Sequence, residues 1–185
     1  MYIEDQTFKG IDVETLRKAE YEYCTFINCD FGNYNLSGFK FIECDFDGCN
    51  FSNANLVDTA FKQVTFTECK MLGLLFDKCD LFNLEMKFEN TMLSHSSFYK
   101  LNLKRTVFNT CNLTAVDFSE ANLSDAYFDG SDLSGAVFQN SNLQGADFRG
   151  AENFTIHPEE NTIKGAKFLK SNLEGLLRHY KIKLS

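Results

Sequence analysis

The sequence lacks several features that would place it in a common class of protein. It has no tryptophan, one proline and no apolar run near the ~20 residues that a membrane helix needs. Its start, MYIEDQTFKG, has neither the basic nor the apolar segment of a signal peptide. A net charge of −8 argues against nucleic acid or an anionic membrane as a partner. We therefore expect a soluble, cytoplasmic protein.

Signs of catalytic chemistry are also missing. The seven cysteines are an odd number, which argues against a disulfide framework. The histidines, His95, His157 and His179, have no cysteine or carboxylate cluster at metal-ligand spacing. Aspartate, serine and histidine occur, but nothing in the sequence fixes a nucleophile beside a base, and the glycines are spread along the chain rather than gathered into a phosphate loop. The sequence predicts no enzyme, no metal and no cofactor.

What the sequence has instead is a period of five. In DLSGAVFQNSNLQGADFRGA, residues 132–151, a leucine or phenylalanine falls at every fifth position. Neither an α-helix nor a plain strand places such a period on one side. We call these positions centres. The first register of centres is Phe26, Phe31, Leu36, Phe41, Phe46, Phe51, Leu56, Phe61, Phe66, Met71, Phe76 and Leu81. The second is Phe88, Leu93, Phe98, Leu103, Phe108, Leu113, Phe118, Leu123, Phe128, Leu133, Phe138, Leu143 and Phe148.

The residues around each centre follow a pattern of their own. Glycine or asparagine, which tolerate positive φ, often stands two positions after a centre and predicts a turn there. The residue two before a centre is usually small, and it shares the inward side with the centre, as in a strand. Cysteine there serves as a small hydrophobic residue. All the cysteines occupy this slot: Cys24, Cys29, Cys44, Cys49, Cys69, Cys79 and Cys111.

A repeat this short indicates a solenoid, which buries its core by stacking coils. We expect an all-β solenoid whose coils have four five-residue faces. Such coils would align seven phenylalanines in one structural core column: Phe26, Phe46, Phe66, Phe88, Phe108, Phe128 and Phe148. In LFNLEMKF, residues 81–88, one step is seven residues long. This step indicates one two-residue insertion, which lies either before or after Met86.

The repeated A(D/N)LXX pattern, as in SNLQG and ADFRG, resembles that of the pentapeptide-repeat family. The resemblance covers residues 22–151 closely. It implies a right-handed quadrilateral β-helix, a rod that carries its function on its surface.

The two ends depart from the repeat. We expect the β-helix to occupy residues 1–170, with residues 1–21 as a degraded capping coil and residues 152–164 as a polar loop. Ser171 and Glu174 form a capping-box pattern before a helical stripe, and residues 181–184 alternate like a strand. Residues 171–185 should therefore cap the rod and form a dimer. The predicted dimer residues are Leu176, Leu177, Tyr180, Ile182 and Leu184.

Charge is uneven between the predicted faces. We call the face built on the phenylalanine column the Phe-column face. It has six acidic residues and two basic ones, Lys87 and Arg149, which gives a net charge of −4. The face before it in each coil, here the preceding face, has three acids and four bases, a net charge of +1. We predict an acidic partner-binding face that fits a protein groove built for DNA phosphates. Its residues are Asp45, Asp47, Glu68, Glu89, Asp129 and Asp147.

The C-terminal GLLRHYKIKL resembles the ending of the quinolone-resistance, or Qnr-type, branch of the family. This resemblance implies an end-to-end homodimer that mimics DNA. It further implies that the protein binds DNA gyrase or topoisomerase IV and protects the enzyme from quinolones. Unlike some members of that branch, the sequence shows no long insertion that would project from the rod. Two alternatives stay open: a rigid scaffold for other proteins, and a simple gyrase inhibitor.

Overall fold

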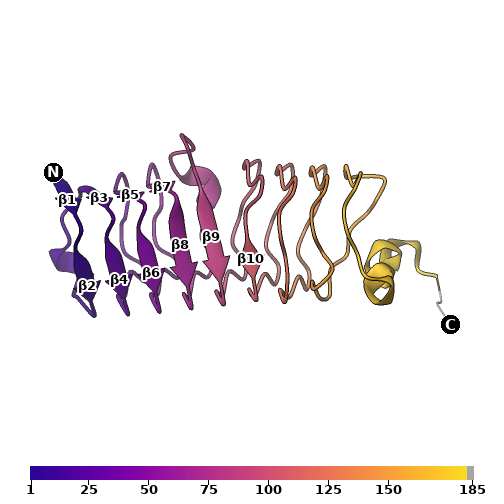
Figure 1. Ribbon diagram of the computed structural model, residues 1–185, viewed down its shortest axis with the longest axis horizontal. Coiled ribbons are helices and arrows are strands. Elements are labelled where there is room, and N and C mark those ends of the chain that lie inside the picture. The colour runs from indigo at the N-terminus through magenta and orange to yellow at the C-terminus, as the bar shows by residue number, and fades with distance from the viewer. Residues whose placement is uncertain (183–185) are drawn as a thin grey trace.

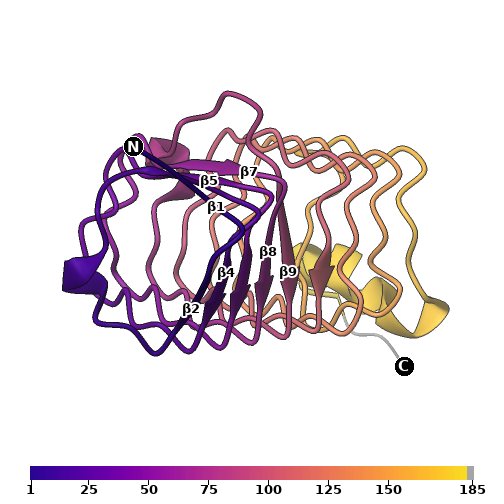
Figure 2. The same cartoon turned by 60° about the vertical axis from the view of Figure 1, so that its left-hand side comes forward.

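The computed structural model describes residues 1–182, which form one rod with residue 1 and the last described residues at opposite ends (Figure 1). The rod is a right-handed quadrilateral β-helix with a short helical cap at its C-terminal end, as the repeat predicts. Figure 2 shows the stacked coils obliquely, with a loop that stands out from one corner of the rod. No helix within the described residues is both long and apolar enough to cross a membrane.

Short parallel strands pair between successive coils on two of the four faces. The six-stranded sheet lies on the Phe-column face and consists of β2 (Thr7–Lys9), β4 (Thr25–Ile27), β6 (Asp45–Asp47), β8 (Val64–Thr67), β9 (Met86–Glu89) and β10 (Phe108–Asn109). The four-stranded sheet lies on the preceding face and consists of β1 (Tyr2–Glu4), β3 (Glu20–Glu22), β5 (Lys40–Ile42) and β7 (Ala60–Lys62). The other two faces are joined by isolated parallel bridges, such as Asn35 with Asn55.

The predicted turns form because the residue two after a centre adopts a left-handed conformation. Asn28 has a φ of 51° and Gly48 a φ of 62°. Glu43 and Arg105, which lack the tolerance of glycine, adopt it too, with φ values of 49° and 63°. The backbone N–H of each such residue then reaches the next coil; that of Glu43 donates to the Lys62 carbonyl oxygen over 2.8 Å. Stacking between coils thus supplies the hydrogen bonds that hold even unfavourable residues in this conformation.

The phenylalanine column is continuous and fully buried. Phe88, Phe108 and Phe128 have no exposed surface, and their ring centroids are 5.2 Å apart at each step. The column also runs further than the predicted seven residues. Phe8 stacks on Phe26 at 4.8 Å, and Phe168 stacks on Phe148 at 5.3 Å.

The cysteines lie in the inward slot, as predicted. All seven are free and buried. Cys44 and Cys69 illustrate their packing, because each sulfur lies within 3.4 Å of a backbone carbonyl oxygen of the preceding coil. Burial raises the pKa of Cys44 and of Cys111 to about 12.

The insertion lies on the N-terminal side of Met86. Val64 pairs with Met86 and Phe66 with Phe88, a step of 22 residues, whereas Ala60 still pairs with Asp80 at 20. Residues 81–85 therefore form a loop that leaves the wall of the rod (Figure 2), where the sequence indicated only a two-residue insertion.

The assignment of Leu81 as a centre is wrong. Its side chain is 54% exposed, and that of Phe82 is 69% exposed. Leu84 packs against the core in this coil. Two extra residues cannot fit between turns of fixed length, so the chain bulges outward at Leu81 and returns inward at Leu84.

The first coil contains an inward residue that the five-residue period does not reveal. The first coil is shorter than the later ones. Ile3 pairs with Tyr21 and Phe8 with Phe26, a step of 18 residues, whereas Phe26 pairs with Phe46, a step of 20. The 3₁₀ helix η1 (Val13–Thr15) crosses one face of this coil. Because of the shorter step, Phe8 falls out of phase in the sequence although it is in register in space.

The C-terminal end differs from its prediction in detail. Phe154 and Ile156, within residues 152–164, are buried, so this segment contributes to the core. The cap consists of the 3₁₀ helices η3 (Lys170–Leu176) and η4 (Arg178–Tyr180). The capping box is wrong, because Ser171 lies inside η3 and the N-cap is Leu169, which makes no side-chain cap.

Side chains and backbone of η3 close the last coil. The Asn172 amide donates to the Phe148 carbonyl oxygen over 3.1 Å. A Cβ on Gly175 would lie 2.4 Å from the Phe154 ring, so only glycine lets the helix lie this close to the core. Lys181 is in a left-handed conformation and Ile182 is not in a strand, so the predicted strand does not begin at residue 181. Its remaining residues, Leu184 among them, lie outside the described part.

Candidate protein-interaction surface

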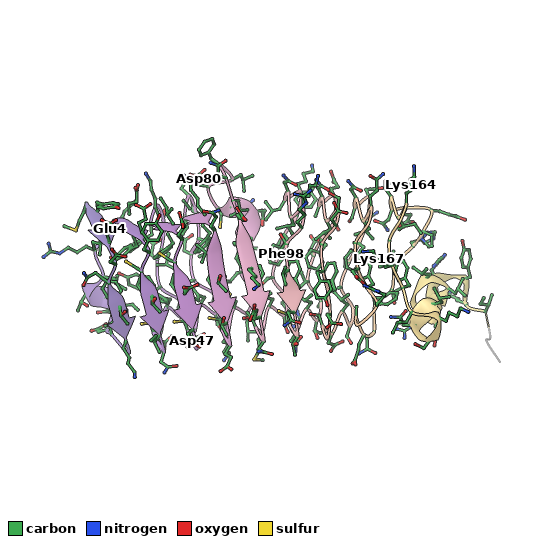
Figure 3. All side chains as sticks on the ribbon, in the orientation of Figure 1. Glu4, Asp47, Asp80, Phe98, Lys164 and Lys167 are labelled. Atoms are coloured by element: carbon green, nitrogen blue, oxygen red, sulfur yellow. The ribbon has the colours of Figure 1, made fainter. Side chains whose placement is uncertain are left out.

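Four of the six acids predicted for the partner-binding face are exposed. β6 positions Asp45 and Asp47 on the outer side of the rod, one on each side of the inward Phe46. Glu68 and Asp129 are exposed on the same face in later coils. Figure 3 shows Asp47 pointing outward along one edge of the rod. Within residues 1–182, none of these four carboxylates forms an ion pair, so their charge is available to a partner.

The other two acids are paired with cations. Glu89 lies 2.5 Å from the Lys87 amine. Asp147, contrary to the prediction, is buried: 10% of its side chain is exposed, and it lies 2.7 Å from Arg149 and 3.9 Å from Lys167. Hydrogen bonds from Arg149 lower the pKa of Asp147 below its ordinary value. Asp147 therefore stabilises the rod and does not form part of an acidic surface.

Further acids adjoin the Phe-column face across the turn that precedes it. Glu22 accepts a hydrogen bond from the Tyr2 hydroxyl, and Glu43 accepts one of 3.2 Å from Tyr23. The negative charge of Glu43 raises the pKa of Tyr23. We call the exposed and half-exposed acids in this part of the rod the acidic band: Glu4, Asp5, Glu22, Glu43, Asp45, Asp47 and Glu68.

Four members of the band were not among the predicted residues. Glu43 was counted with the preceding face, although it lies in the turn between the two faces. Glu4, Asp5 and Glu22 precede Phe41, the first centre for which charges on the preceding face were counted. Along the Phe-column face the charge then changes sign towards the C-terminus, where Arg149, Lys167 and Lys170 lie. The negative surface is therefore a band near the N-terminal half and not a stripe along the whole rod.

The predicted dimer residues divide into two groups. Leu176 packs against the core, and Leu177 is half-buried. Tyr180 and Ile182 are 47% and 54% exposed, and the Tyr180 hydroxyl donates to Glu159 over 3.0 Å. Leu169 and Leu173, outside the predicted set, are also exposed. The end of the rod thus presents apolar surface.

Two histidines meet in this cap, a contact that their sequence spacing does not suggest. The rings of His157 and His179 stack with their centroids 3.7 Å apart, beside Tyr180. Across the described chain, no three side chains of histidine, cysteine, aspartate or glutamate gather so that they could hold a metal ion.

The repeat has a recognised counterpart. The family described as "Pentapeptide repeat region" matches residues 19–98, 84–153 and 101–177. The chain belongs to the pentapeptide-repeat family. Comparison of this pentapeptide-repeat protein with curated protein sequences returned no significant match.

Solved structures resemble the whole rod. Trypsin-treated QnrB1, described as a plasmid-mediated fluoroquinolone resistance protein, aligns with a TM-score of 0.65 and 19% identity over 100% of this chain and 98% of its own. Full-length QnrB1 aligns with a TM-score of 0.60 and 22% identity over 98% of this chain and 100% of its own. At such identity the likeness shows the fold: a rod of similar length with the same kind of coils.

Proposed function

We propose that this pentapeptide-repeat protein binds a type II topoisomerase, DNA gyrase or topoisomerase IV, as a DNA mimic and protects it from quinolones. The observation that carries the proposal is the likeness to QnrB1 over essentially the full length of both chains. A match limited to a few coils would indicate only a shared repeat. Here the rod length and the helical C-terminal cap correspond as well.

The acidic band supplies the mechanism. Its carboxylates lie in neighbouring coils of a rigid rod, and strands in such coils are about 4.8 Å apart. A surface that holds DNA binds it largely through phosphate charge, so closely spaced carboxylates can occupy the same cationic groove. The apolar C-terminal end would join two rods into a homodimer with two such bands.

Supercoiling assays test the proposal. Gyrase is titrated with the protein in the presence and absence of ciprofloxacin, and DNA supercoiling is measured. Recovery of supercoiling in the presence of the drug supports protection. Loss of supercoiling without the drug supports simple inhibition. No effect in either arm, together with failure of the protein to retain gyrase in a pull-down, rules out the topoisomerase.

Charge reversal tests the role of the acidic band. Changing Asp45, Asp47 and Glu68 to lysine should weaken gyrase binding, and salt should weaken the binding of the unaltered protein. These side chains are outward and unpaired, so the rod should stay folded. The matched control reverses three exposed acids elsewhere: Glu14, Asp58 and Glu160. Equal loss of binding in both variants would mean that only net charge matters.

A scaffold for another protein is the second candidate. The loop at residues 81–85 favours it, because a DNA mimic needs no apolar projection and Leu81 and Phe82 are both exposed there. A protein with this function would leave gyrase unaffected in both arms of the assay.

A further inference from the structure

The loop creates a groove where the preceding face meets the Phe-column face. The groove has a volume of about 770 Å³. Val64, Leu84 and Met86 contribute apolar surface to its lining. It extends over four successive coils, from Ile42 to Lys104. The groove borders the acidic band: Ile42 in its lining directly precedes Glu43, and Thr65 pairs with Asp45. Glu4, at the N-terminal end of the band, lies several coils away, near the end of the rod (Figure 3).

The charge of this groove is opposite to that of the protein. Lys62, Lys87, Lys104 and Arg105 line it, against one acid, Glu85, so that positive charges exceed negative ones by three. Lys87 is paired with Glu89. Among the ion pairs of residues 1–182, none involves Lys62, Lys104 or Arg105. In a chain of net charge −8, three such cations in one recess are available to an anionic partner.

The insertion also interrupts the backbone ladder at this point. β7 is the last strand of the four-stranded sheet, because residues 81–84 leave the wall. In the neighbouring coil the Glu43 N–H bonds to the Lys62 carbonyl oxygen, but within the described chain the equivalent N–H of Gln63 has no such partner. The N–H of Asn102 likewise has no backbone acceptor within the described chain. In the next coil the equivalent N–H, that of Asn122, donates to the Leu101 carbonyl oxygen over 2.8 Å. Both residues line the groove, so their donors are available to carbonyl oxygens of a bound peptide.

We propose that this basic groove binds an extended acidic peptide segment of a partner protein. Lys62 and Lys104 lie two coils apart, a separation of about 10 Å between their strands. Extended chain advances about 3.3 Å per residue, so carboxylates three residues apart match that distance. Apolar residues between the carboxylates would contact Val64 and Met86, and the peptide backbone would accept hydrogen bonds from Gln63 or Asn102.

A nucleic acid fits this groove less well. The four cations are confined to one recess, and a long polyanion leaving it would meet a surface of net negative charge. A single phosphate also fits less well, because the cations are spread over several coils and do not converge on one point. The inference goes beyond the proposed function, since it concerns the cations that line the groove and not the carboxylates of the adjoining acidic band.

Fluorescence anisotropy tests the groove without gyrase. The probe is a fluorescein-labelled hexapeptide, Glu-Val-Asp-Glu-Val-Glu, and the comparison peptide replaces each acid by its amide. We expect the full-length protein to bind the acidic peptide and not the amide peptide. The variant Lys104→Glu with Arg105→Glu should weaken binding about tenfold or more. Position 105 has a positive φ that Glu43 and Glu68 also adopt, so glutamate is accommodated there.

The matched control reverses Lys9 and Lys164, which are exposed, unpaired within residues 1–182 and outside the groove. It should bind the acidic peptide as the unaltered protein does. Failure of the unaltered protein to bind the acidic peptide overturns the inference, as does equal loss of affinity in both variants. Tighter binding of a thymidine hexanucleotide would make this a nucleic-acid site, and displacement of the peptide by millimolar inorganic phosphate would make it a single-anion site. Either result also overturns the inference.

Discussion

The phenylalanine column provides the sharpest test of what holds the rod together, through the substitution Phe108→Ala. The Phe108 ring is fully buried, stacks on Phe88 and Phe128 at 5.2 Å, and meets Phe98 and Phe118 edge-on at 5.7 and 5.6 Å. Removing a buried ring loses its transfer free energy and leaves a cavity, which together cost about 3–5 kcal/mol. Four aromatic neighbours place Phe108 at the upper end, so we expect about 4–5 kcal/mol.

The comparison is Phe8→Ala, at the N-terminal end of the same column. Phe8 is half-buried and has one stacking partner in the column, Phe26 at 4.8 Å. We expect its loss to cost about 1–2 kcal/mol, because less surface is buried and the open end can relax. Phe108→Leu should cost less than Phe108→Ala, since leucine fills the centres Leu103 and Leu113 of the same coils. Phe108→Asp should prevent folding, because it buries a charge.

Urea denaturation, followed by far-UV circular dichroism, measures these free energies of unfolding. The slope of the transition should also be compared, because a cavity at mid-rod can uncouple the two halves of a solenoid. If Phe108→Ala destabilises the protein by no more than Phe8→Ala, the column does not stabilise the rod in the way its geometry indicates.

Three further predictions concern the thiols, the pH dependence and the C-terminal end. The seven thiols, exemplified by Cys44 with its pKa of about 12, should not react with a thiol reagent at pH 8 in the native protein but should all react in denaturant; rapid native labelling would contradict their packing. Asp147→Asn should cost about 1–2 kcal/mol at pH 7 through the lost bonds from Arg149. The lowered pKa of Asp147 means that its contribution is complete above the ordinary carboxyl pKa of about 4, and it should disappear as the pH falls through the folded-state value; a constant difference between the two proteins down to pH 2 would contradict this. Tyr180→Glu with Ile182→Glu should dissociate the proposed dimer into monomers in sedimentation, because both side chains are exposed at the apolar end; a dimer that persists would place the contact elsewhere, and a monomeric unaltered protein would refute the proposed dimer.

The five-residue period was sufficient to predict the fold class, the inward slot of the cysteines and the phenylalanine column. Each of these depends on residues at a fixed spacing, and stacking in register makes every coil repeat the same environment. The positions of the turns followed for the same reason: a residue two after a centre, such as Gly48 or Asn28, must bend the chain from one face to the next.

The tertiary structure decided what happens where the spacing breaks. The five-residue period predicted that Leu81 points inward. In the structure Leu84 packs against the core instead, because the segment between two turns of the rod is two residues too long and bulges outward at Leu81. The period did not identify Phe8 as a member of the phenylalanine column, because the coil that contains Phe8 is shorter than the others.

The distribution of charge was also determined partly by the sequence and partly by the tertiary structure. The sequence alone established a net charge of −8 and predicted that the Phe-column face is more acidic than the face before it. Only the folded rod shows that Asp147 is neutralised by Arg149 and Lys167, and that Glu43 joins the Phe-column face across a turn. The cations of the basic groove line one recess because residues 81–84 leave the wall between the coils of Lys62 and Lys104. Periodic order can be read along the chain, whereas pairing between coils and the shape of an interruption arise from contacts between residues about twenty positions apart.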